Sequence, residues 1–305
     1  MILITEFMDE AAVERLSSAH STRYVPDLAD RQGDIRAMMP GVQALIVRNR
    51  TRVTAELIAE APDLKMVGRL GVGLDNIDLD ACAARGIEVI PATGANTLSV
   101  AEYVVTNALI LLRDAYMARD EMMSGAWPRG TCGAGREVRG RRLGLVGFGA
   151  IAQETARLAL PLGMTVAGYD PYLSADDPAW AGTERMDLDE LISTSEVLSL
   201  HVPLTDATHH IINAGMLARM PAGSVLINAA RGGIVDETAL CDALRSGHLS
   251  GAALDVFESE PLTATSARKF EGLQNLILTP HIAGVTEDSN VRVSGMIADE
   301  VLKRL

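Results

Sequence analysis

The sequence predicts an α/β protein with two doubly wound parallel sheets. Short apolar runs alternate with amphipathic segments along almost all of the 305 residues, which is the pattern of strands joined by helical crossovers. Helices that cover both faces of a parallel sheet allow its strands to be apolar throughout, as these runs are. A long apolar segment and a connector rich in Gly and Arg, between residues 99 and 141, separate two such series.

The first series occupies residues 1 to about 95. Its predicted strands are ILITEF, ALIVRN, KMVGRLG and IEVIPA, and its predicted helices are DEAAVERLSSAH, TAELIAEAP and DLDACAARG. The glycine that ends the third of these helices is typical of a helix C-cap. We interpret SVAEYVVTNALILLRDAY, residues 99–116, as a buried core or interface helix, and residues 124–141 as a connector.

The second series begins at Arg142. Its predicted strands are RLGLVG, MTVAGYD, EVLSLHVP, SVLINAA, GAALDVF and NLILTPH, and its predicted helices are AIAQETARLALPLG, LDELISTS, NAGMLARMP and ETALCDALRSG. Six strands with helical crossovers equal the count of a complete dinucleotide-binding doubly wound sheet. A final helix, from about residue 287 to residue 305, is predicted beyond the sixth strand.

The composition is that of an ordinary globular protein, with 48% hydrophobic and 22% charged residues. A net charge of −13 repels phosphate backbones and anionic lipid, so we expect neither nucleic acid nor membrane as a partner. No apolar run reaches the roughly 18 residues of a membrane-spanning helix, and the N-terminus does not resemble a signal peptide. Cys82, Cys132 and Cys241 lack CxxC spacing, which argues against disulfides or a metal site and fits the cytoplasm.

The segment GFGAIA follows the predicted strand RLGLV and opens a helix, which is the context of a dinucleotide phosphate loop. Gly147 permits the tight turn, and Gly149 lets a pyrophosphate approach the backbone. Ala152 takes the place of the third glycine, where a methyl group is tolerated. We expect the free N–H groups of Ala150 and Ile151 to face the phosphate, aided by the helix dipole.

Asp170 lies 21 residues after Gly149, at the end of the next predicted strand. A carboxylate there can accept hydrogen bonds from the adenosine ribose and would repel a 2′-phosphate. Pro171 and Tyr172 follow it, rather than a basic residue, so the pattern favours NAD over NADP. Taken alone, Asp170 could equally be a turn residue at a strand end.

Three further segments, AARGGIVDE, LDVFESEP and TPHIAG, follow predicted strands, where ligands bind in open α/β sheets. They carry Arg231, Glu260 and His281. Hydride transfer to a 2-keto acid needs a cation for the carboxylate, a proton donor for the developing alkoxide, and a group that stabilises the charged donor. Arg, His and Glu match these needs. Each residue alone could instead be a surface charge, a turn histidine or a solvated loop glutamate.

In order and spacing, GFGAIA…YDP, HVPLT, NAARGGIVDE, ALDVFESEP and TPHIAG resemble the D-isomer-specific 2-hydroxyacid dehydrogenases. VGRLGVGLDNIDL and ATGANTLSVAEY extend the resemblance to nearly the whole chain. It implies a Rossmann NAD-binding domain, residues 99–286, inserted in a flavodoxin-like substrate domain made of residues 1–98 and 287–305. It also implies a homodimer, which suits the apolar segment 99–116.

By the same resemblance, His281 is the acid/base, Glu260 its partner, and Arg231 the ligand of the substrate carboxylate and carbonyl. The positions implied to line the NAD site are Val72, Gly147, Gly149, Ala150, Ile151, Asp170, Val202, Ala229, Asp255 and Gly284, with Asp255 facing the nicotinamide carboxamide. Those implied to bind the substrate are Arg48, Asn49, Arg50, Gly71, Val72, Gly73 and Arg231.

Arginines at the strand end VRNR suggest that the substrate carries a second anion. Arg48 and Arg50 flank Asn49 in this turn, and Arg69 precedes the turn LGVG; Arg50 or Arg69 could instead pair with surface carboxylates. VRNRT and the two segments of the first half are similar to bacterial sulfolactate dehydrogenases. This resemblance implies 3-sulfolactate as the first choice of substrate and 3-phosphoglycerate as the second.

Two functions from other classes compete with this prediction. An NAD-sensing corepressor shares the fold, but we expect such a protein to carry added recognition segments. A methyltransferase also uses a Gly-rich turn and an acidic strand end, but it needs neither six strands nor the set Arg231, Glu260 and His281. Binding of NADH without turnover of a 2-keto acid would favour the corepressor, and failure to bind NADH would favour the methyltransferase.

Overall fold

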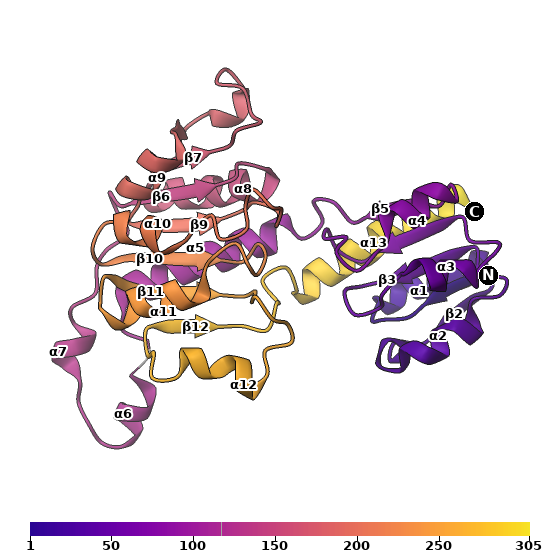
Figure 1. Cartoon of the computed structure of the whole chain (residues 1–305), viewed down its shortest axis with the longest axis horizontal. Helices are drawn as coiled ribbons and strands as arrows, with labels where there is room; N and C mark the ends of the chain where they lie inside the picture. The colour runs from indigo at the N-terminus through magenta and orange to yellow at the C-terminus, as the bar shows by residue number, and fades with distance from the viewer. Residues whose placement is uncertain (117) are drawn as a thin grey trace. The chain divides into compact units, whose positions relative to one another are not determined.

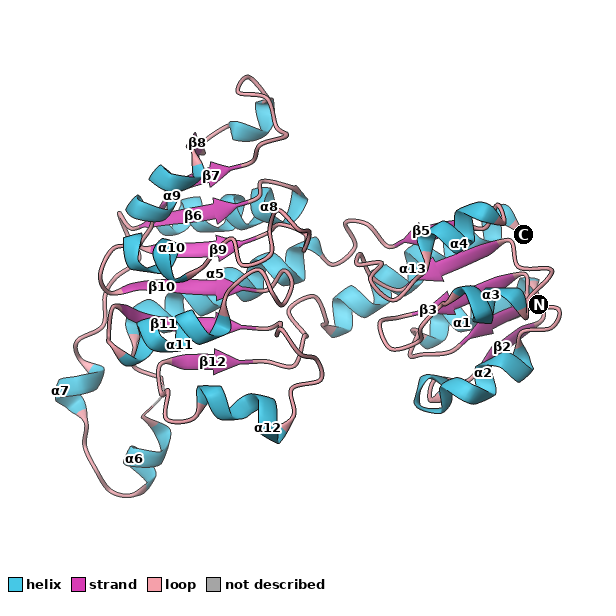
Figure 2. Ribbon diagram, viewed as in Figure 1, coloured by secondary structure: helices cyan, strands magenta, loops and turns pink. Residues whose placement is uncertain are grey.

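The structure is a computed structural model that describes residues 1–116 and 118–305. The chain divides into two compact units, one formed by residues 1–96 and 285–305 and the other by residues 97–284. Each unit is a parallel β-sheet with helices packed on it (Figures 1 and 2). The predicted fold class, two doubly wound parallel sheets, is confirmed.

The sheet of the first unit has five parallel strands in the order β2-β1-β3-β4-β5, which is the flavodoxin-like order. The strands are β1 (Ile2–Ile4), β2 (Thr22–Tyr24), β3 (Ala44–Val47), β4 (Met66–Arg69) and β5 (Glu88–Pro91). The helices are α1 (Glu10–Ala19), η1 (Leu28–Arg31), α2 (Gln32–Met38), α3 (Ala55–Ala59), α4 (Leu79–Ala84) and α13 (Glu287–Arg304). The sequence did not predict the edge strand β2, because its residues Thr, Arg and Tyr form no apolar run.

Helix α13 completes the core of this first unit, although it is separated from the unit's other elements by the whole second unit. Its residues Val293, Ile297 and Val301 are buried in the same cluster as Ile2 and Ile4. At Gly68 in β4, an added Cβ would lie 2.8 Å from Cγ2 of Ile297, so the glycine allows the helix to approach the strand closely.

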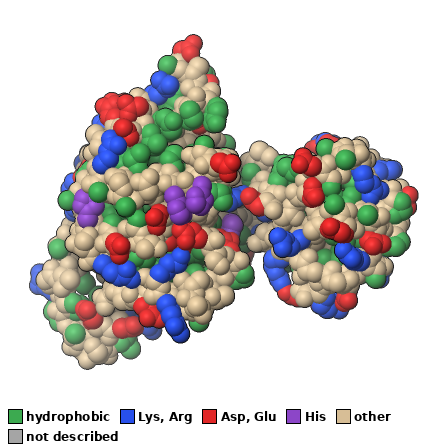
Figure 3. Space-filling view, in the orientation of Figure 1, with side chains coloured by type: hydrophobic (Ala, Val, Ile, Leu, Met, Phe, Trp, Pro, Cys, Tyr) green, Lys and Arg blue, Asp and Glu red, His purple; other side chains and the backbone are tan. Residues whose placement is uncertain are grey.

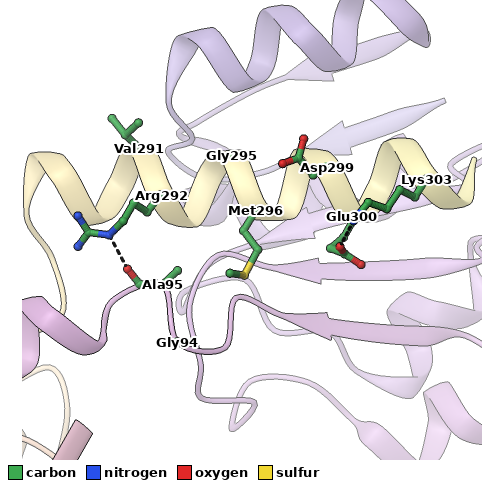
Figure 4. A pocket seen from close by; sticks show the side chains of 9 residues that line it. All are labelled: Gly94, Ala95, Val291, Arg292, Gly295, Met296, Asp299, Glu300 and Lys303. Atoms are coloured by element: carbon green, nitrogen blue, oxygen red, sulfur yellow. Dashed lines mark hydrogen bonds and ion pairs between the residues drawn. The ribbon is translucent and has the colours of Figure 1, made fainter. Parts of the chain in front are cut away.

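A shallow depression borders α13 in the same unit, and Figure 4 shows the side chains that line it. There Nε of Arg292 donates a hydrogen bond of 3.0 Å to the carbonyl oxygen of Ala95. Since Ala95 lies in the segment after β5, this hydrogen bond ties the last helix to the end of the first stretch of chain in the unit.

The second unit has seven parallel strands in the order β12-β11-β10-β9-β6-β7-β8. They are β6 (Arg142–Val146), β7 (Thr165–Tyr169), β8 (Glu184–Arg185), β9 (Val197–Leu200), β10 (Ser224–Asn228), β11 (Leu249–Leu254) and β12 (Leu276–Leu278). The prediction of six strands was one too few, because the two residues of the edge strand β8 are both charged. The strand order reverses between β6 and β9, which is where ligands bind in such sheets.

Helices on both faces enclose two apolar cores in this unit. The helices are α5 (Thr97–Arg113), α6 (Arg119–Met123), α7 (Arg129–Cys132), α8 (Ala150–Ala159), η2 (Leu160–Leu162), η3 (Pro178–Trp180), α9 (Leu188–Thr194), α10 (Ala214–Arg219), α11 (Glu237–Arg245), α12 (Ala264–Ala267) and η4 (Arg268–Phe270). The apolar helix α5 packs against α8 and buries Val104, Ala108 and Leu112 in one core. The segment predicted as a plain connector contains the single turn α7.

The surface carries charges of both signs, and in Figure 3 Lys and Arg side chains lie among Asp and Glu side chains on both units. Within the described ranges 1–116 and 118–305, the helices are all too short or too polar to cross a bilayer. In the same ranges, His, Cys, Asp and Glu side chains do not gather in groups of three or more that could hold a metal ion.

Candidate active site

The loop after β6 has the backbone shape of a phosphate cradle. Gly147 has a φ of +86°, and an added Cβ would lie 2.8 Å from the carbonyl oxygen of His201 and 2.9 Å from Cγ1 of Val202. At Gly149, the residue that precedes α8, an added Cβ would meet no atom within 4 Å. The exposed N-terminus of α8, with Ala150 and Ile151 in its first turn, therefore offers free N–H groups beside open space.

Asp170 fixes the shape of this loop from the end of β7. One carboxylate oxygen accepts a hydrogen bond of 2.9 Å from the amide of Phe148, and the other accepts one of 2.9 Å from the amide of Tyr172. Each carboxylate oxygen can accept a further hydrogen bond. The sequence left two alternatives for Asp170, a turn residue at a strand end or a ligand of the ribose. The two roles are compatible, because the carboxylate that shapes the turn can still accept a hydrogen bond from a ribose hydroxyl.

His281 and Glu260, which are 21 residues apart in the chain, meet at the carboxyl ends of β12 and β11. Nδ1 of His281 lies 2.8 Å from Oε2 of Glu260, and the amide of Phe257 donates to Oε1 of Glu260 at 2.9 Å. The side chains of His281 and Glu260 are 41% and 34% exposed, so the pair is open to a ligand. Because Nδ1 is engaged, Nε2 is the imidazole nitrogen left to face a substrate.

Electrostatics keep Glu260 ionised. Burial alone would raise the pKa of Glu260, but the hydrogen bonds from His281 and the Phe257 amide outweigh it, together with the charges of His281 and Arg231. The net result is a lowered pKa of Glu260. An ionised Glu260 stabilises a protonated imidazole at His281, which is what a proton donor requires.

The loop that carries Arg231 is held by Asn228, the last residue of β10. Oδ1 of Asn228 accepts from the amide of Ala230 at 3.1 Å, and its Nδ2 donates to the carbonyl oxygen of Arg231 at 2.9 Å. The next residue, Gly232, lies so close to Phe257 that an added Cβ would overlap the Phe257 carbonyl oxygen. The loops that carry Arg231 and Glu260 are thus packed backbone to backbone.

Asp255 has a structural task that the sequence did not predict. It is 1% exposed, and its carboxylate accepts from Oγ1 of Thr279 at 2.6 Å and from the amides of Ile282 and Ala283 at 2.8 Å each. The carboxylate therefore shapes the loop on which His281 stands, and that residue has a φ of +56°. That Asp255 also faces the nicotinamide remains a prediction. Oδ2 can accept one further hydrogen bond, which the carboxamide of the nicotinamide would donate.

Two other polar groups of the second unit were also missed. Tyr103 in α5 lies 2.7 Å, hydroxyl to hydroxyl, from Thr279, and burial raises the pKa of Tyr103 to about 12. At the end of β9, His201 lies 3.0 Å from the Ser199 hydroxyl through its Nε2. Although His201 as a whole is only partly buried, desolvation of its ring lowers the pKa of His201 to about 4, so it stays neutral near pH 7. The place of His201 at a strand end was an available signal, whereas Tyr103 lies within a helix, and the strand-end pattern could not find it.

Three of the four remaining residues predicted to line the cofactor site lie in segments that follow strands of the second unit. Val202 follows β9, and Ala229 follows β10; both are partly buried. Gly284, the last residue of the second unit, is partly buried as well. Val72 belongs to the first unit, where its side chain is 39% exposed.

In the first unit, the buried carboxylate of Glu6 organises the turn that follows β3. Oε1 of Glu6 accepts from the amides of Arg48 and Thr51 at 2.8 and 2.9 Å, and Oε2 accepts from the amide of Arg50 at 3.1 Å. Glu6 lies two residues after the end of β1, so its place near a strand end was the only sequence signal for this role. The exposed Asn49 lies at the tip of this turn.

The arginines of this turn have different surroundings. Nη2 of Arg48 donates to Oδ1 of Asn290 at 2.8 Å; burial lowers the pKa of Arg48, although the nearby Glu6 acts in the opposite direction. Arg50 forms an ion pair with Asp30, the surface pairing that the sequence left open. Nη1 of Arg69 donates to the carbonyl oxygen of Leu70 at 2.8 Å and lies over the backbone of Gly71, which precedes Val72 and Gly73.

Comparison with known proteins places the whole chain among enzymes of one kind. Residues 105–283 match the family model of the D-isomer specific 2-hydroxyacid dehydrogenase, NAD binding domain. Over 305 residues the chain is 53% identical to (S)-sulfolactate dehydrogenase of Chromohalobacter salexigens, covering 100% of this chain and 98% of that protein. It is 37% identical over 302 residues to hydroxypyruvate reductase of Thermotoga maritima, covering 99% and 97%. With D-3-phosphoglycerate dehydrogenase of Archaeoglobus fulgidus it is 37% identical over 301 residues, but covers only 56% of that protein.

Solved structures share the fold of this chain over almost its whole length. The TT0316 protein of Thermus thermophilus has a TM-score of 0.90 and 32% identity, with coverage of 99% of this chain and 95% of that one. D-lactate dehydrogenase of Aquifex aeolicus, complexed with NAD and lactic acid, has a TM-score of 0.84 and 30% identity, with coverage of 99% and 94%.

Proposed function

Because the chain belongs to the D-isomer specific 2-hydroxyacid dehydrogenase family and is therefore an NAD-dependent oxidoreductase acting on CH–OH groups, we propose that its substrate pair is 3-sulfolactate and 3-sulfopyruvate. The proposed substrate is supported by the 53% identity, over the full chain, with (S)-sulfolactate dehydrogenase. The proposed acid/base chemistry is supported by the 2.8 Å contact between His281 and Glu260.

The residues of the phosphate loop fit NAD, because Gly149 leaves open space at the N-terminus of α8 and Asp170 can accept from ribose hydroxyls. Gly147, Ala150 and Ile151 complete the surface offered to the pyrophosphate. When bound, NADH supplies the hydride for reduction of the 2-keto carbon.

The chain's own residues supply the proton and the orientation. Nε2 of His281 delivers a proton to the oxygen of the 2-keto group, and the reverse reaction returns it there. Glu260 holds Nδ1 and stabilises the charged imidazole. Arg231 binds the substrate carboxylate and polarises the carbonyl, a task that suits its forked guanidinium.

We assign the sulfonate end of the substrate to Arg48 rather than Arg50. Arg50 already pairs with Asp30, whereas the contact recorded for the Arg48 guanidinium is with the neutral amide of Asn290. The Arg48 charge is therefore less fully compensated, and burial strengthens its attraction for an anion. Asn49, Gly71, Val72 and Gly73 form the remaining turn surfaces proposed to contact the substrate.

We expect the purified protein to reduce 3-sulfopyruvate with a kcat/KM at least about 100-fold above that for pyruvate, because a partly buried arginine left without its anion costs about 2–3 kcal/mol. The measurement is the initial rate of NADH oxidation with 3-sulfopyruvate, 3-phosphohydroxypyruvate and pyruvate. A preference for 3-phosphohydroxypyruvate would establish the 3-phosphoglycerate alternative, and equal rates with pyruvate would refute the anionic tail.

Two arginine variants locate the tail. Arg48→Met is expected to remove most of the preference for 3-sulfopyruvate over pyruvate. It should change kcat/KM for pyruvate by less than about threefold, because Arg48 is proposed to contact only the sulfonate, which pyruvate lacks. Arg50→Met is the matched control from the same turn, and it should leave the preference in place. The opposite pattern would assign the tail to Arg50.

Cofactor choice is expected to depend on the charge of Asp170. Asp170→Asn keeps an oxygen that can accept from a backbone amide but removes the charge that repels a 2′-phosphate, so the NADPH-to-NADH ratio of kcat/KM should rise about tenfold or more. Asp177→Asn is the control. Asp177 also accepts a hydrogen bond from a backbone amide, that of Ala179 at 2.9 Å, but it lies outside the phosphate loop. An unchanged ratio in Asp170→Asn would remove Asp170 from the ribose site.

We also propose that the protein is a cytoplasmic homodimer. The three cysteines are free, which suits a reducing compartment. Tyr116, Met123 and Trp127, in and beside α6, are 67%, 77% and 75% exposed, and a second copy of the chain could cover these apolar side chains. A monomeric molar mass by light scattering would contradict the dimer. An NAD-sensing corepressor remains the alternative if NADH binds without turnover of any 2-keto acid.

A further inference from the structure

Two glutamates of the second unit exchange backbone hydrogen bonds beside the proposed catalytic groups. Oε1 of Glu237, the first residue of α11, accepts from the amide of Glu258 at 2.7 Å. In return, Oε1 of Glu258 accepts from the amide of Glu237 at 3.2 Å. The exchange joins the start of α11 to the loop that follows β11.

A single cation lies between the two carboxylates. Nζ of Lys269 forms an ion pair with Oε2 of Glu237 and lies 3.2 Å from Oε2 of Glu258. Burial alone would lower the pKa of Lys269, but the two glutamates outweigh it and raise that pKa. His210 adds a contact of 3.1 Å between its Nε2 and Oε1 of Glu258. The side chain of Glu237 is only 3% exposed, so its bonds are protected from solvent.

This cluster connects directly to the pair of Glu260 and His281. The amide of Glu258 donates to Glu237, and the preceding amide, that of Phe257, donates to Oε1 of Glu260. Oε2 of Glu260 in turn contacts Nδ1 of His281. Two consecutive backbone amides are thus each held by a glutamate: that of Phe257 by Glu260, and that of Glu258 by Glu237.

We propose that Glu237 is a positioning residue for the reaction, which holds the backbone at Phe257 and Glu258 so that Glu260 keeps His281 oriented. This inference rests on the proposed function for its effect on turnover, but its effect on His281 can be measured without turnover. Without Glu237, the amide of Glu258 loses its acceptor, and Lys269 loses its most buried partner. The loop is then expected to shift, and a shift of about 1 Å can cost about 100-fold in rate.

The test compares Glu237→Ala with Glu237→Gln and with the control Glu196→Ala. Glutamine keeps an oxygen that can accept from the amide of Glu258, so it should restore function if the hydrogen bond is what matters. Glu196, which is partly buried, is the control because it has the same kinds of partner as Glu237: it pairs with Arg141 at 2.5 Å and accepts from the amide of Arg142 at 3.3 Å. It precedes β9, at the opposite end of the strands from His281.

We expect Glu237→Ala to lower kcat about 10- to 100-fold, with KM for the keto acid and the affinity for NADH each within about threefold of wild type. Glu237→Gln should recover kcat to within about fivefold, and Glu196→Ala should keep the wild-type value, since its bonds touch neither loop. Rates are normalised to the concentration of NADH-binding sites, so that unfolded protein does not count.

The second readout is the NMR signal of the imidazole proton between Nδ1 of His281 and Glu260, which needs no substrate. In Glu237→Ala this signal should shift upfield or disappear through exchange with water, because a displaced Glu260 no longer holds the proton. It should not change in Glu196→Ala. If Glu237→Ala yields no folded protein, Lys269→Met tests the same link, because it leaves the buried carboxylate of Glu237 and the partly exposed carboxylate of Glu258 without their shared cation.

The outcomes are distinct. A shifted or lost His281 proton signal and a lowered kcat, both restored by glutamine, support the inference. A proton signal and a normalised kcat equal to those of Glu196→Ala overturn it. A wild-type protein that turns over no 2-keto acid contradicts the proposed function, and a proton signal shifted or lost in Glu237→Ala would still establish Glu237 as the residue that positions His281.

Discussion

Replacing His281 by asparagine is expected to lower kcat for the 2-keto acid by about 100- to 10,000-fold, because the variant has no group that can deliver a proton to the substrate oxygen. Asparagine can still occupy the loop and bond to Glu260, so the affinity for NADH should change by less than about threefold. The measurements are NADH oxidation at saturating substrate and NADH fluorescence titration on the same samples.

A matched histidine makes this result specific. His248→Asn alters a partly buried histidine of the second unit, whose Nε2 lies 3.0 Å from the carbonyl oxygen of Leu217, and it should leave kcat unchanged. Glu260→Gln should give an intermediate loss of about 10- to 100-fold, since it removes a charge that stabilises the imidazolium but not the proton donor itself. If His281→Asn keeps more than a tenth of the wild-type kcat, another group donates the proton.

Replacing Asp255 by asparagine is expected to lower the free energy of unfolding of the second unit by about 2–4 kcal/mol. The amide NH2 of asparagine would have to face at least one of the three donors, which are the Thr279 hydroxyl and the amides of Ile282 and Ala283. At least one of these donors would lose its acceptor, and the remaining donors would bond to a neutral oxygen instead of a charged one. Turnover should fall as well, because the same bonds shape the loop of His281.

The measurement is urea unfolding followed by tryptophan fluorescence, since Trp127 and Trp180 both belong to the second unit and Trp180 is buried against Phe148. Asp242→Asn, which alters an exposed partner of Arg245, is the control and should change the free energy by less than about 0.5 kcal/mol. Equal stability of Asp255→Asn and wild type would show that the buried carboxylate is not what holds the loop.

The parts of the fold that the sequence predicted well are those fixed by local rules. An apolar run such as RLGLV can be satisfied only as a buried strand, and the glycines after it only as a turn, so β6 and Gly147 follow from the sequence. The edge strands β2 and β8 could not be found this way. Their residues are polar, and they are strands because a neighbouring strand offers hydrogen bonds, which a local pattern does not contain.

The candidate site was predictable to the extent that its residues lie at strand ends. His281 and Glu260 do meet, as their positions after two neighbouring strands require. What a strand-end carboxylate binds was not predictable, because its partners come from loops that fold back from elsewhere. Asp255 therefore appeared only as a ligand for the cofactor, whereas it also holds three donors of the chain, and the roles of Glu6 and Glu237 were missed entirely.

The return of α13 to the first sheet has a consequence during synthesis on the ribosome. The five strands of the first unit emerge early, but one apolar face of their sheet is covered only in part, by α1, until residues 285–305 have been made. At about 5–20 residues per second, the intervening residues 97–284 take roughly 10–40 s to translate. The nascent chain therefore exposes an incomplete apolar layer for that time, which makes it a natural client for chaperones that shield such surfaces co-translationally.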